Sequence, residues 1–235
     1  QAVKTFQFQQ GRLLVMYQWR PDMMMQIQSQ GQSLLLSDDD QARLRVYNAR
    51  LGETTQSLPS STASLVKLFR PLFSMAKQRS DSGEDPIADN RAIVLLLALY
   101  VNKQPVREFV DSDDAALYPQ ARQVSVTLFE REDLGQHFLT SAAIATSADS
   151  GVAEALGVFK ELDDSKGGSG FSFADLAADR AGVQFAELVA RISYDAKQAQ
   201  RRLSQVESET EFMPRVDNLP EGIMALELKQ QYDNL

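Results

Sequence analysis

The chain contains no cysteine and a single histidine, His137. Without cysteine it forms no disulfide bonds, performs no thiol catalysis and builds no zinc site from thiolates. A cysteine-free chain also fits an oxidising compartment. Any imidazole chemistry in this chain therefore involves His137.

Basic residues are also scarce, since 24 Lys and Arg stand against 32 Asp and Glu and the net charge is −8. Binding to a phosphate backbone needs clustered Lys and Arg. The one dense basic cluster, Arg201 and Arg202, lies among acids on a predicted late helix and is typical of a solvated face. The charge balance therefore argues against nucleic acid as a partner.

Long hydrophobic runs are missing as well. The longest, AIVLLLALYV at 92–101, has ten residues, whereas a helix that spans a bilayer needs about 20. The run therefore predicts a buried core helix and no transmembrane segment. The chain begins at Gln1 rather than at a methionine, so we expect a signal peptide to have been removed from a longer precursor.

Residues 1–58 are expected to form a β-rich region. Apolar residues alternate with polar ones around Phe6, Leu13 and Met23, and turn signals fall at 10–11, 21–22 and 30–31. This pattern predicts an antiparallel meander of short strands with one face in water. The segment ARLRVYNARL at 42–51 is a candidate for a further strand.

From Pro59 onward the spacing of apolar residues is helical. Residues 60–78 predict a helix with a kink or break at Pro71. Residues 124–129 predict a short strand, and the C-terminal segment 212–235 predicts a short final helix. Three successive helices are expected over 131–148, 151–164 and 173–206. The predicted fold class is α+β and predominantly helical, with the N-terminal antiparallel meander beside a helical bundle. Residues 1–58 and 59–235 then form two regions, or one continuous domain.

Each of the last three predicted helices carries ionisable and small residues on one stripe. The first stripe holds Asp133, His137 and Ser141; the second holds Gly157, Glu161 and Asp164; the third holds Asp175, Asp179 and Gly182. Small residues allow helices to approach within roughly 8–10 Å. If the stripes face one another, the sequence predicts a polar pocket formed by His137, Glu161, Asp175 and Asp179.

Two kinds of chemistry use such a pocket. A divalent cation would be held by His137, Glu161, Asp164 and Asp179 through carboxylate oxygens and one imidazole. Alternatively, His137, Glu161, Asp175 and Asp179 are the catalytic candidates for general acid–base hydrolysis. Neither spacing is diagnostic, because the sequence has no metalloprotease, Walker, nucleophile-elbow or dinucleotide-binding motif.

Structural explanations compete with both chemistries. Ser172 and Asp175 have the spacing of an N-cap residue and a first-turn acid. Asp133 is similarly expected to act as a cap or as a partner of the helix dipole. Asp179 lies a full turn beyond the cap, where a charge needs a buried partner. In a third interpretation, the whole cluster only stabilises the helix bundle.

The string QHFLTSAAI…ALGVFKELDD…GFSFADLAADRAG resembles the motif of the YfiM-like group of small bacterial envelope lipoproteins. The motif of this group has an acidic residue at a fixed position after its Lys-Glu pair. Asp164 stands at that position, and Asp163 lies one residue before it. The matching positions are His137, Phe138, Ser141, Gly157, Lys160, Glu161, Asp164, Gly170, Phe171, Ser172, Asp175, Leu176, Asp179 and Gly182. This resemblance implies the periplasm or cell envelope as the compartment. The group has no established reaction, so the resemblance carries over no catalytic role.

Our leading interpretation is a non-enzymatic envelope protein that binds a ligand or an envelope protein partner through the polar pocket. The alternative is a periplasmic hydrolase, with or without a divalent cation, that uses the same residues. An exposed apolar surface around Trp19 and Met23–Met25 would favour partner binding.

Overall fold

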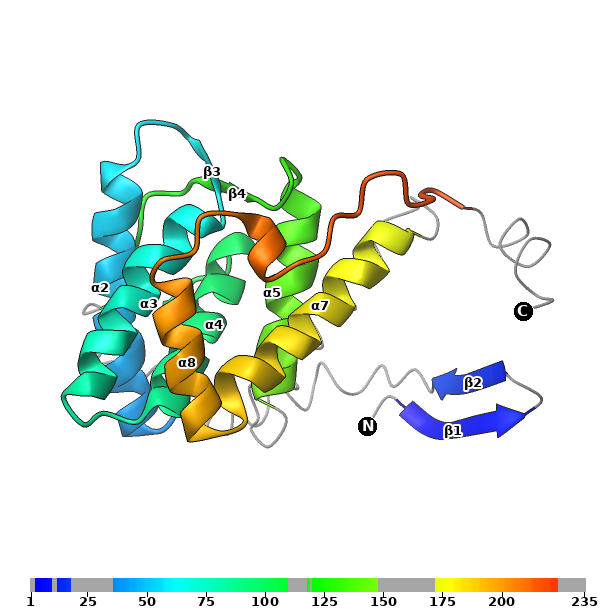
Figure 1. Ribbon diagram of the computed structural model, residues 1–235, viewed down its shortest axis with the longest axis horizontal. Helices are drawn as coiled ribbons and strands as arrows, with labels where there is room; N and C mark the ends of the chain where they lie inside the picture. The colour runs from blue at the N-terminus through cyan, green and yellow to red at the C-terminus, as the bar shows by residue number, and fades with distance from the viewer. Residues whose placement is uncertain are drawn as a thin grey trace.

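A computed structural model describes residues 3–9, 12–17, 36–109, 118, 120–147 and 172–223 (Figure 1). These residues are predominantly helical. The α-helices are α2 (Asp38–Ser57), α3 (Val66–Asp81), α4 (Pro86–Val101), α5 (Glu132–Thr146), α7 (Phe173–Ala190) and α8 (Ser193–Leu203). The short elements are β1 (Val3–Gln9), β2 (Arg12–Tyr17), β3 (Thr62–Ser64), β4 (Ser125–Thr127) and two 3-10 turns, η1 (Val106–Phe109) and η3 (Glu209–Glu211).

The predicted antiparallel meander is not supported. Strands β1 and β2 pair antiparallel on either side of the turn at 10–11, and within the described residues this sheet has two strands. The segments around Trp19 and Met23–Met25 lie outside the described residues. The prediction of a strand at 42–51 is wrong, because these residues belong to α2.

Helix α2 forms because its buried positions follow the helical period. Leu44, Tyr47 and Leu51 are buried, whereas Val46, which made the segment look alternating, is 36% exposed. Ser37 caps the helix by accepting a hydrogen bond from the Asp40 nitrogen at 3.2 Å. Helix α2 packs against α3 and α4, so the helical part begins well before the boundary expected at residue 58.

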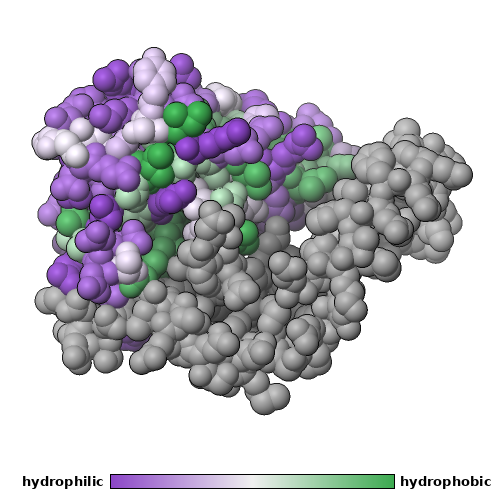
Figure 2. All heavy atoms as spheres, turned by 90° about the horizontal axis from the view of Figure 1, so that it is seen from below, coloured by the Kyte–Doolittle hydropathy of each residue, from purple (hydrophilic) through white to green (hydrophobic). Residues whose placement is uncertain are grey.

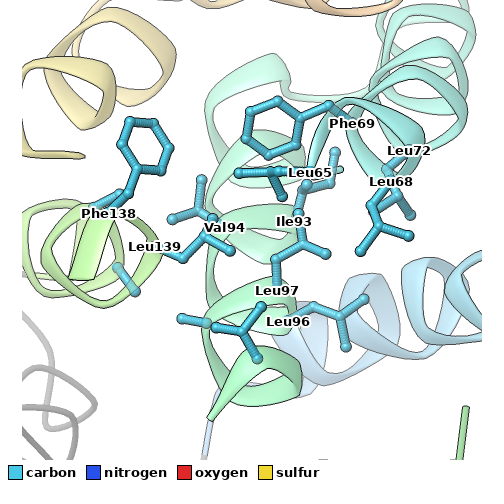
Figure 3. Packing of buried hydrophobic residues seen from close by; sticks show 14 of the residues in the cluster. Leu65, Leu68, Phe69, Leu72, Ile93, Val94, Leu96, Leu97, Phe138 and Leu139 are labelled. Atoms are coloured by element: carbon cyan, nitrogen blue, oxygen red, sulfur yellow. The ribbon is translucent and has the colours of Figure 1, made fainter. Parts of the chain in front are cut away.

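Helix α4 is the centre of the core and contacts each of the other described α-helices. The predicted burial of 92–101 is confirmed, and Ile93, Leu96 and Leu97 are fully buried (Figure 3). Asp85 caps the helix, since its carboxylate accepts a hydrogen bond from the Ile87 nitrogen at 2.9 Å. In the described part of the chain, no helix has the length and hydropathy needed to cross a membrane.

The segment after Pro59 differs in detail from the prediction. Strand β3 occupies 62–64 and pairs in parallel with β4, which confirms the strand expected within 124–129. The helix therefore begins at Val66. Pro71 does not break it, because α3 continues to Asp81.

The helix expected over 173–206 is two helices, α7 and α8. Buried Asn90 of α4 lies at their junction, where its amide donates to the carbonyl oxygens of Val189 at 2.7 Å and Ala196 at 3.3 Å. Gln200 of α8 donates to the Asn90 side-chain oxygen at 2.9 Å. The break satisfies buried polar groups of α4.

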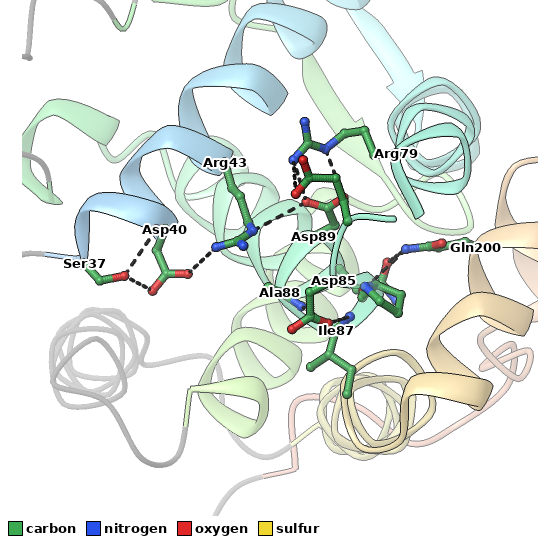
Figure 4. Close-up of polar contacts among 12 residues, drawn as sticks. Ser37, Asp40, Arg43, Arg79, Asp85, Ile87, Ala88, Asp89 and Gln200 are labelled. Atoms are coloured by element: carbon green, nitrogen blue, oxygen red, sulfur yellow. Dashed lines mark hydrogen bonds and ion pairs between the residues drawn. The ribbon is translucent and has the colours of Figure 1, made fainter. Parts of the chain in front are cut away.

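A buried ion pair ties α2, α3 and α4 together (Figure 4). Asp89 is fully buried and accepts hydrogen bonds from Arg79 at 3.0 Å (Nε) and 3.3 Å (Nη2). Arg43 of α2 approaches Asp89 at 3.8 Å. Burial, followed by the charge of Asp89, raises the pKa of Tyr47 far above its usual value. This pair was not predicted from the sequence.

The described surface seen in Figure 2 is mainly hydrophilic, with apolar residues scattered among polar ones. Several large apolar side chains along α7 and at its junction with α8 are nevertheless exposed. They are Leu176, Val183, Leu188, Ile192 and Tyr194. Single exposed apolar residues are ordinary on a globular surface.

Candidate functional site

The candidate site lies where α5 and α7 cross, and its geometry depends on Gly182. A Cβ atom at residue 182 would lie well inside contact distance of the Phe138 carbonyl oxygen and 3.1 Å from the Ala142 nitrogen. The absence of a side chain therefore lets the two backbones touch. This close approach confirms the expectation that small residues bring the polar stripes of these helices together.

Three of the predicted site residues converge at this crossing. The His137 Nδ1 atom lies 3.3 Å from Oδ1 of Asp179, and its Nε2 atom lies 3.8 Å from Oδ2 of Asp175. The hydroxyl of Ser141, one turn after His137, donates to Oδ1 of Asp179 at 2.6 Å. The three ionisable side chains are 22–30% exposed. The imidazole is thus held between two carboxylates of α7.

Arg131 extends the cluster beyond the two helices. Its guanidinium pairs with Asp133 at 2.5 Å, with Asp175 at 3.6 Å and with Glu221. The Asp133 hydrogen bond, the largest influence, raises the pKa of Arg131. Neither Arg131 nor Glu221 was predicted from the sequence, because residues 90 positions apart give no local signal. We call the set Arg131, Asp133, His137, Ser141, Asp175, Asp179 and Glu221 the α5–α7 polar cluster.

Asp175 serves two purposes. The Ser172 hydroxyl accepts a hydrogen bond from the Asp175 nitrogen at 3.1 Å, which confirms Ser172 as the N-cap of α7. The Asp175 carboxylate also faces His137 and Arg131. Its Oδ1 atom is buried without a hydrogen bond, and the Arg131 guanidinium 3.6 Å away balances its charge.

Asp133 is a first-turn acid of α5 rather than its cap. The N-cap position is Arg131, whose side chain makes no capping hydrogen bond. A carboxylate in the first turn is favoured by the helix dipole, as expected. The stronger interaction is with Arg131, whose hydrogen bonds hold the pKa of Asp133 below its usual value.

The remaining predicted site residues, Glu161 and Asp164, lie outside the described residues. Among the residues that are described, no group of three or more His, Asp and Glu side chains is arranged to hold a metal ion. The cation site of His137, Glu161, Asp164 and Asp179 therefore stays a prediction.

The hydrogen-bond directions limit the chemistry of the cluster. An activated serine donates its proton to a histidine that a carboxylate orients. Here Ser141 donates instead to Asp179, and the same oxygen of Asp179 contacts His137. The carboxylate thus stands between hydroxyl and imidazole. The arrangement fixes the orientation of His137 but does not form a Ser-His-Asp relay.

The pairing of Asp133 with Arg131 predicts a specific acid sensitivity. A carboxyl group whose pKa is lower in the folded chain than in the unfolded chain stabilises the fold at any pH above its unfolded pKa. This stabilisation is lost as the pH falls through the pKa of the folded state. Between about pH 7 and about pH 2, melting of Asp133→Asn should therefore depend less on pH than melting of wild type. Glu187→Gln, which removes an exposed carboxylate of α7, is the control. Parallel curves for wild type and Asp133→Asn would contradict the pairing.

Comparison of the chain with protein-family models, curated proteins and solved structures finds no match.

Proposed function

We propose that this protein is a non-enzymatic binding module of the bacterial cell envelope, and that its α5–α7 polar cluster helps to recognise a ligand or a partner protein. One observation carries the proposal. Ser141 and His137 both contact Oδ1 of Asp179, so the polar groups satisfy one another instead of forming an activated nucleophile. Such a cluster is suited to present a fixed set of charges and hydrogen-bonding groups.

The geometry of the cluster supports recognition. Its charged side chains are 22–48% exposed, so they are accessible and still held by neighbours. Contacts from α5, from α7 and from Glu221 fix the cluster before any partner arrives. Groups that are already ordered lose less conformational entropy on binding, which favours affinity.

The envelope assignment rests on two features of the sequence. The absence of cysteine fits an oxidising compartment. The resemblance over residues 137–182 implies the periplasm or the envelope. Fractionation of cells that express the natural gene tests the assignment, and recovery in the cytosolic fraction would contradict it.

Site-specific photo-crosslinking tests the binding role. A photoreactive amino acid replaces Leu176, which is 50% exposed and follows Asp175. The matched control replaces Val46, which is 36% exposed on α2. In an envelope extract we expect a discrete adduct from position 176, none from position 46, and loss of the adduct when His137→Ala is added. Equal labelling from both positions, or an adduct that His137→Ala does not change, would contradict recognition by the cluster.

Thermal melting separates recognition from a purely structural role. We expect His137→Gln and Asp179→Asn to melt within about 4 °C of wild type, which corresponds to roughly 1 kcal/mol in a chain of this size. Functional groups are often retained without benefit to stability. A fall of more than about 10 °C would assign the cluster to holding the bundle together. A Mn²⁺-dependent rise of the melting midpoint that both variants abolish would instead assign a cation site.

The hydrolase alternative keeps one supporting observation, the contact of 3.3 Å between His137 and Asp179, which resembles a base and its orienting carboxylate. An activated-ester substrate tests it. We expect no turnover above that of the His137→Ala variant. Saturable turnover that His137→Ala and Ser141→Ala both remove would replace the binding role with hydrolysis.

A further inference from the structure

One face of α7 is left uncovered by the rest of the described fold. The helix runs along the outside of the bundle (Figure 1) and packs against α4, α5 and α8. Its exposed positions recur every three or four residues, which places them on a single face. We define the outer face of α7 by six of these exposed residues, Leu176, Arg180, Val183, Gln184, Glu187 and Arg191.

Two large apolar side chains lie seven residues apart on the outer face of α7. Leu176 is 50% exposed and Val183 is 43% exposed. Ile192, which directly follows the outer face, is exposed as well. Single exposed apolar residues need no explanation, but residues seven apart occupy the same line of a helix, along which two helices pack against each other. The outer face therefore has an apolar line suited to contact with another helix.

The outer face of α7 also carries two opposite charges, Arg180 and Glu187, and both side chains are exposed. In the described part of the chain, neither of them forms an ion pair. Their spacing of seven residues corresponds to about 10 Å along the helix. The midpoint between them falls between Val183 and Gln184, at the centre of the outer face.

This arrangement is complementary to itself. If two copies of α7 lie antiparallel, with a two-fold axis between Val183 and Gln184, positions equally far from the axis lie opposite each other. Arg180 of one copy then meets Glu187 of the other, and the same contact occurs a second time. Val183 meets its own counterpart beside the axis. Leu176 lies level with the aliphatic stem of Arg191 of the second copy.

From these observations we infer that the outer face of α7 binds a second copy of this chain in an antiparallel, two-fold symmetric contact. A parallel pairing would place Arg180 against Arg180 and Glu187 against Glu187, and like charges at a contact are unfavourable. A partner of one charge sign would leave either Arg180 or Glu187 facing a like charge. The antiparallel second copy pairs both.

The dimer is expected to be weak. A contact along a single helix is smaller than the roughly 1,200–2,000 Å² of a stable interface, so association should depend on concentration. At about 1 µM the chain should be monomeric. Melting midpoints measured at that concentration, including that of Glu187→Gln, are therefore those of the single copy.

Sedimentation equilibrium of the full chain from about 5 µM to about 500 µM tests the inference. Wild type should show a reversible dimer. Arg180→Glu and Glu187→Arg each place like charges opposite each other twice, so each should weaken dimerisation about tenfold or more. The combined variant exchanges the two charges and should recover dimerisation to within about threefold of wild type. Arg70→Glu, the same change on an exposed position of α3, should dimerise like wild type.

Two outcomes of this experiment would overturn the inference. The first is a wild-type chain that stays monomeric at about 500 µM. The second is a combined variant that dimerises as weakly as the single reversals. Recovery in the combined variant also shows that neither reversal acts by unfolding the chain.

Disulfide cross-linking tests the position of the axis, and the absence of cysteine makes an introduced thiol unique. Val183→Cys should give a covalent dimer with diamide, which takes up the two electrons and two protons of the paired thiols. The two copies of Leu176→Cys would lie about 22 Å apart along the helices, whereas a disulfide needs Cα atoms within about 7 Å. Leu176→Cys should therefore stay monomeric. Equal cross-linking of the two variants would overturn the inference.

The inference goes beyond the proposed function, and the two can fail separately. The α5–α7 polar cluster lies on the side of α7 that faces α5, and its test depends on His137. A photo-adduct between two copies has twice the mass of the chain and does not depend on His137. An adduct with an envelope partner has a different mass and is lost in His137→Ala.

Discussion

Replacing Asp89 by alanine should reduce the free energy of unfolding by about 3–5 kcal/mol, the usual effect of removing one partner of a buried ion pair. Asp89 is fully buried and takes two hydrogen bonds from Arg79, whose side chain is only 23% exposed. Without the carboxylate, the acidic partner left to the Arg79 guanidinium among the described residues is Glu84, at 3.4 Å. Arg43 also loses its contact with Asp89.

Thermal melting and urea unfolding measure this effect. The midpoint should fall by roughly 6–20 °C, at 2–4 °C per kcal/mol for a chain of this size. Asp81→Ala is the matched control, because it removes an aspartate from the exposed ion pair with Lys77 at 2.9 Å. Exposed pairs contribute little, so the control should melt close to wild type. Similar midpoints for Asp89→Ala and Asp81→Ala would contradict the burial of Asp89.

A double variant tests whether the pair stabilises the fold or only avoids an unpaired charge. Replacing both Asp89 and Arg79 by leucine removes both charges of the pair, and Arg43 keeps its contact with Asp40 at 3.6 Å. Apolar replacement of a buried pair is often neutral or stabilising. We therefore expect Asp89→Leu with Arg79→Leu to be clearly more stable than Asp89→Leu alone.

Gly182→Ala should destabilise the protein by about 3 kcal/mol, even though alanine is intrinsically the better helix former by about 1 kcal/mol. The added Cβ atom would collide with the backbone of Phe138, and backbone atoms cannot move aside as a flexible side chain can. Helices α5 and α7 would have to separate. Separation would also loosen the contact between the rings of Phe138 and Phe185, whose centroids are 5.2 Å apart.

Gly52→Ala provides the matched control for Gly182→Ala. Gly52 lies within α2, and a Cβ atom there would have no neighbour within 4 Å. The same substitution should therefore raise the free energy of unfolding by up to about 1 kcal/mol. Urea unfolding of the two variants should show shifts of opposite sign. Stabilisation by Gly182→Ala would contradict the close crossing of α5 and α7.

Features that depend on neighbouring residues were predictable from the sequence. The ten apolar residues at 92–101 become the buried part of α4, and Ser172 caps α7. Caps, turns and helical spacing act within a few residues, so a single segment contains the required information. That Asp175 and Asp179 lie on one side of α7 was also predictable, because a spacing of four residues places them on the same face of a helix.

Features that depend on distant partners were not predictable in this way. The segment 42–51 fits a strand as well as a helix by its pattern, and packing against α3 and α4 makes it helical. The break between α7 and α8 follows from Asn90, about 100 positions earlier in the chain. The pairing of Arg131 with Glu221 likewise joins residues that are far apart in the sequence.

The sequence by itself thus determined the cap of α7, the buried run of α4 and which ionisable residues share a helix face. Only the tertiary structure decided which of those faces meet, that Asp179 stands between Ser141 and His137, and that Asp89 is buried with Arg79. The physical reason is the range of the interactions. Capping and periodicity act within one or two helical turns, whereas buried charges and touching backbones are defined only when distant segments pack together.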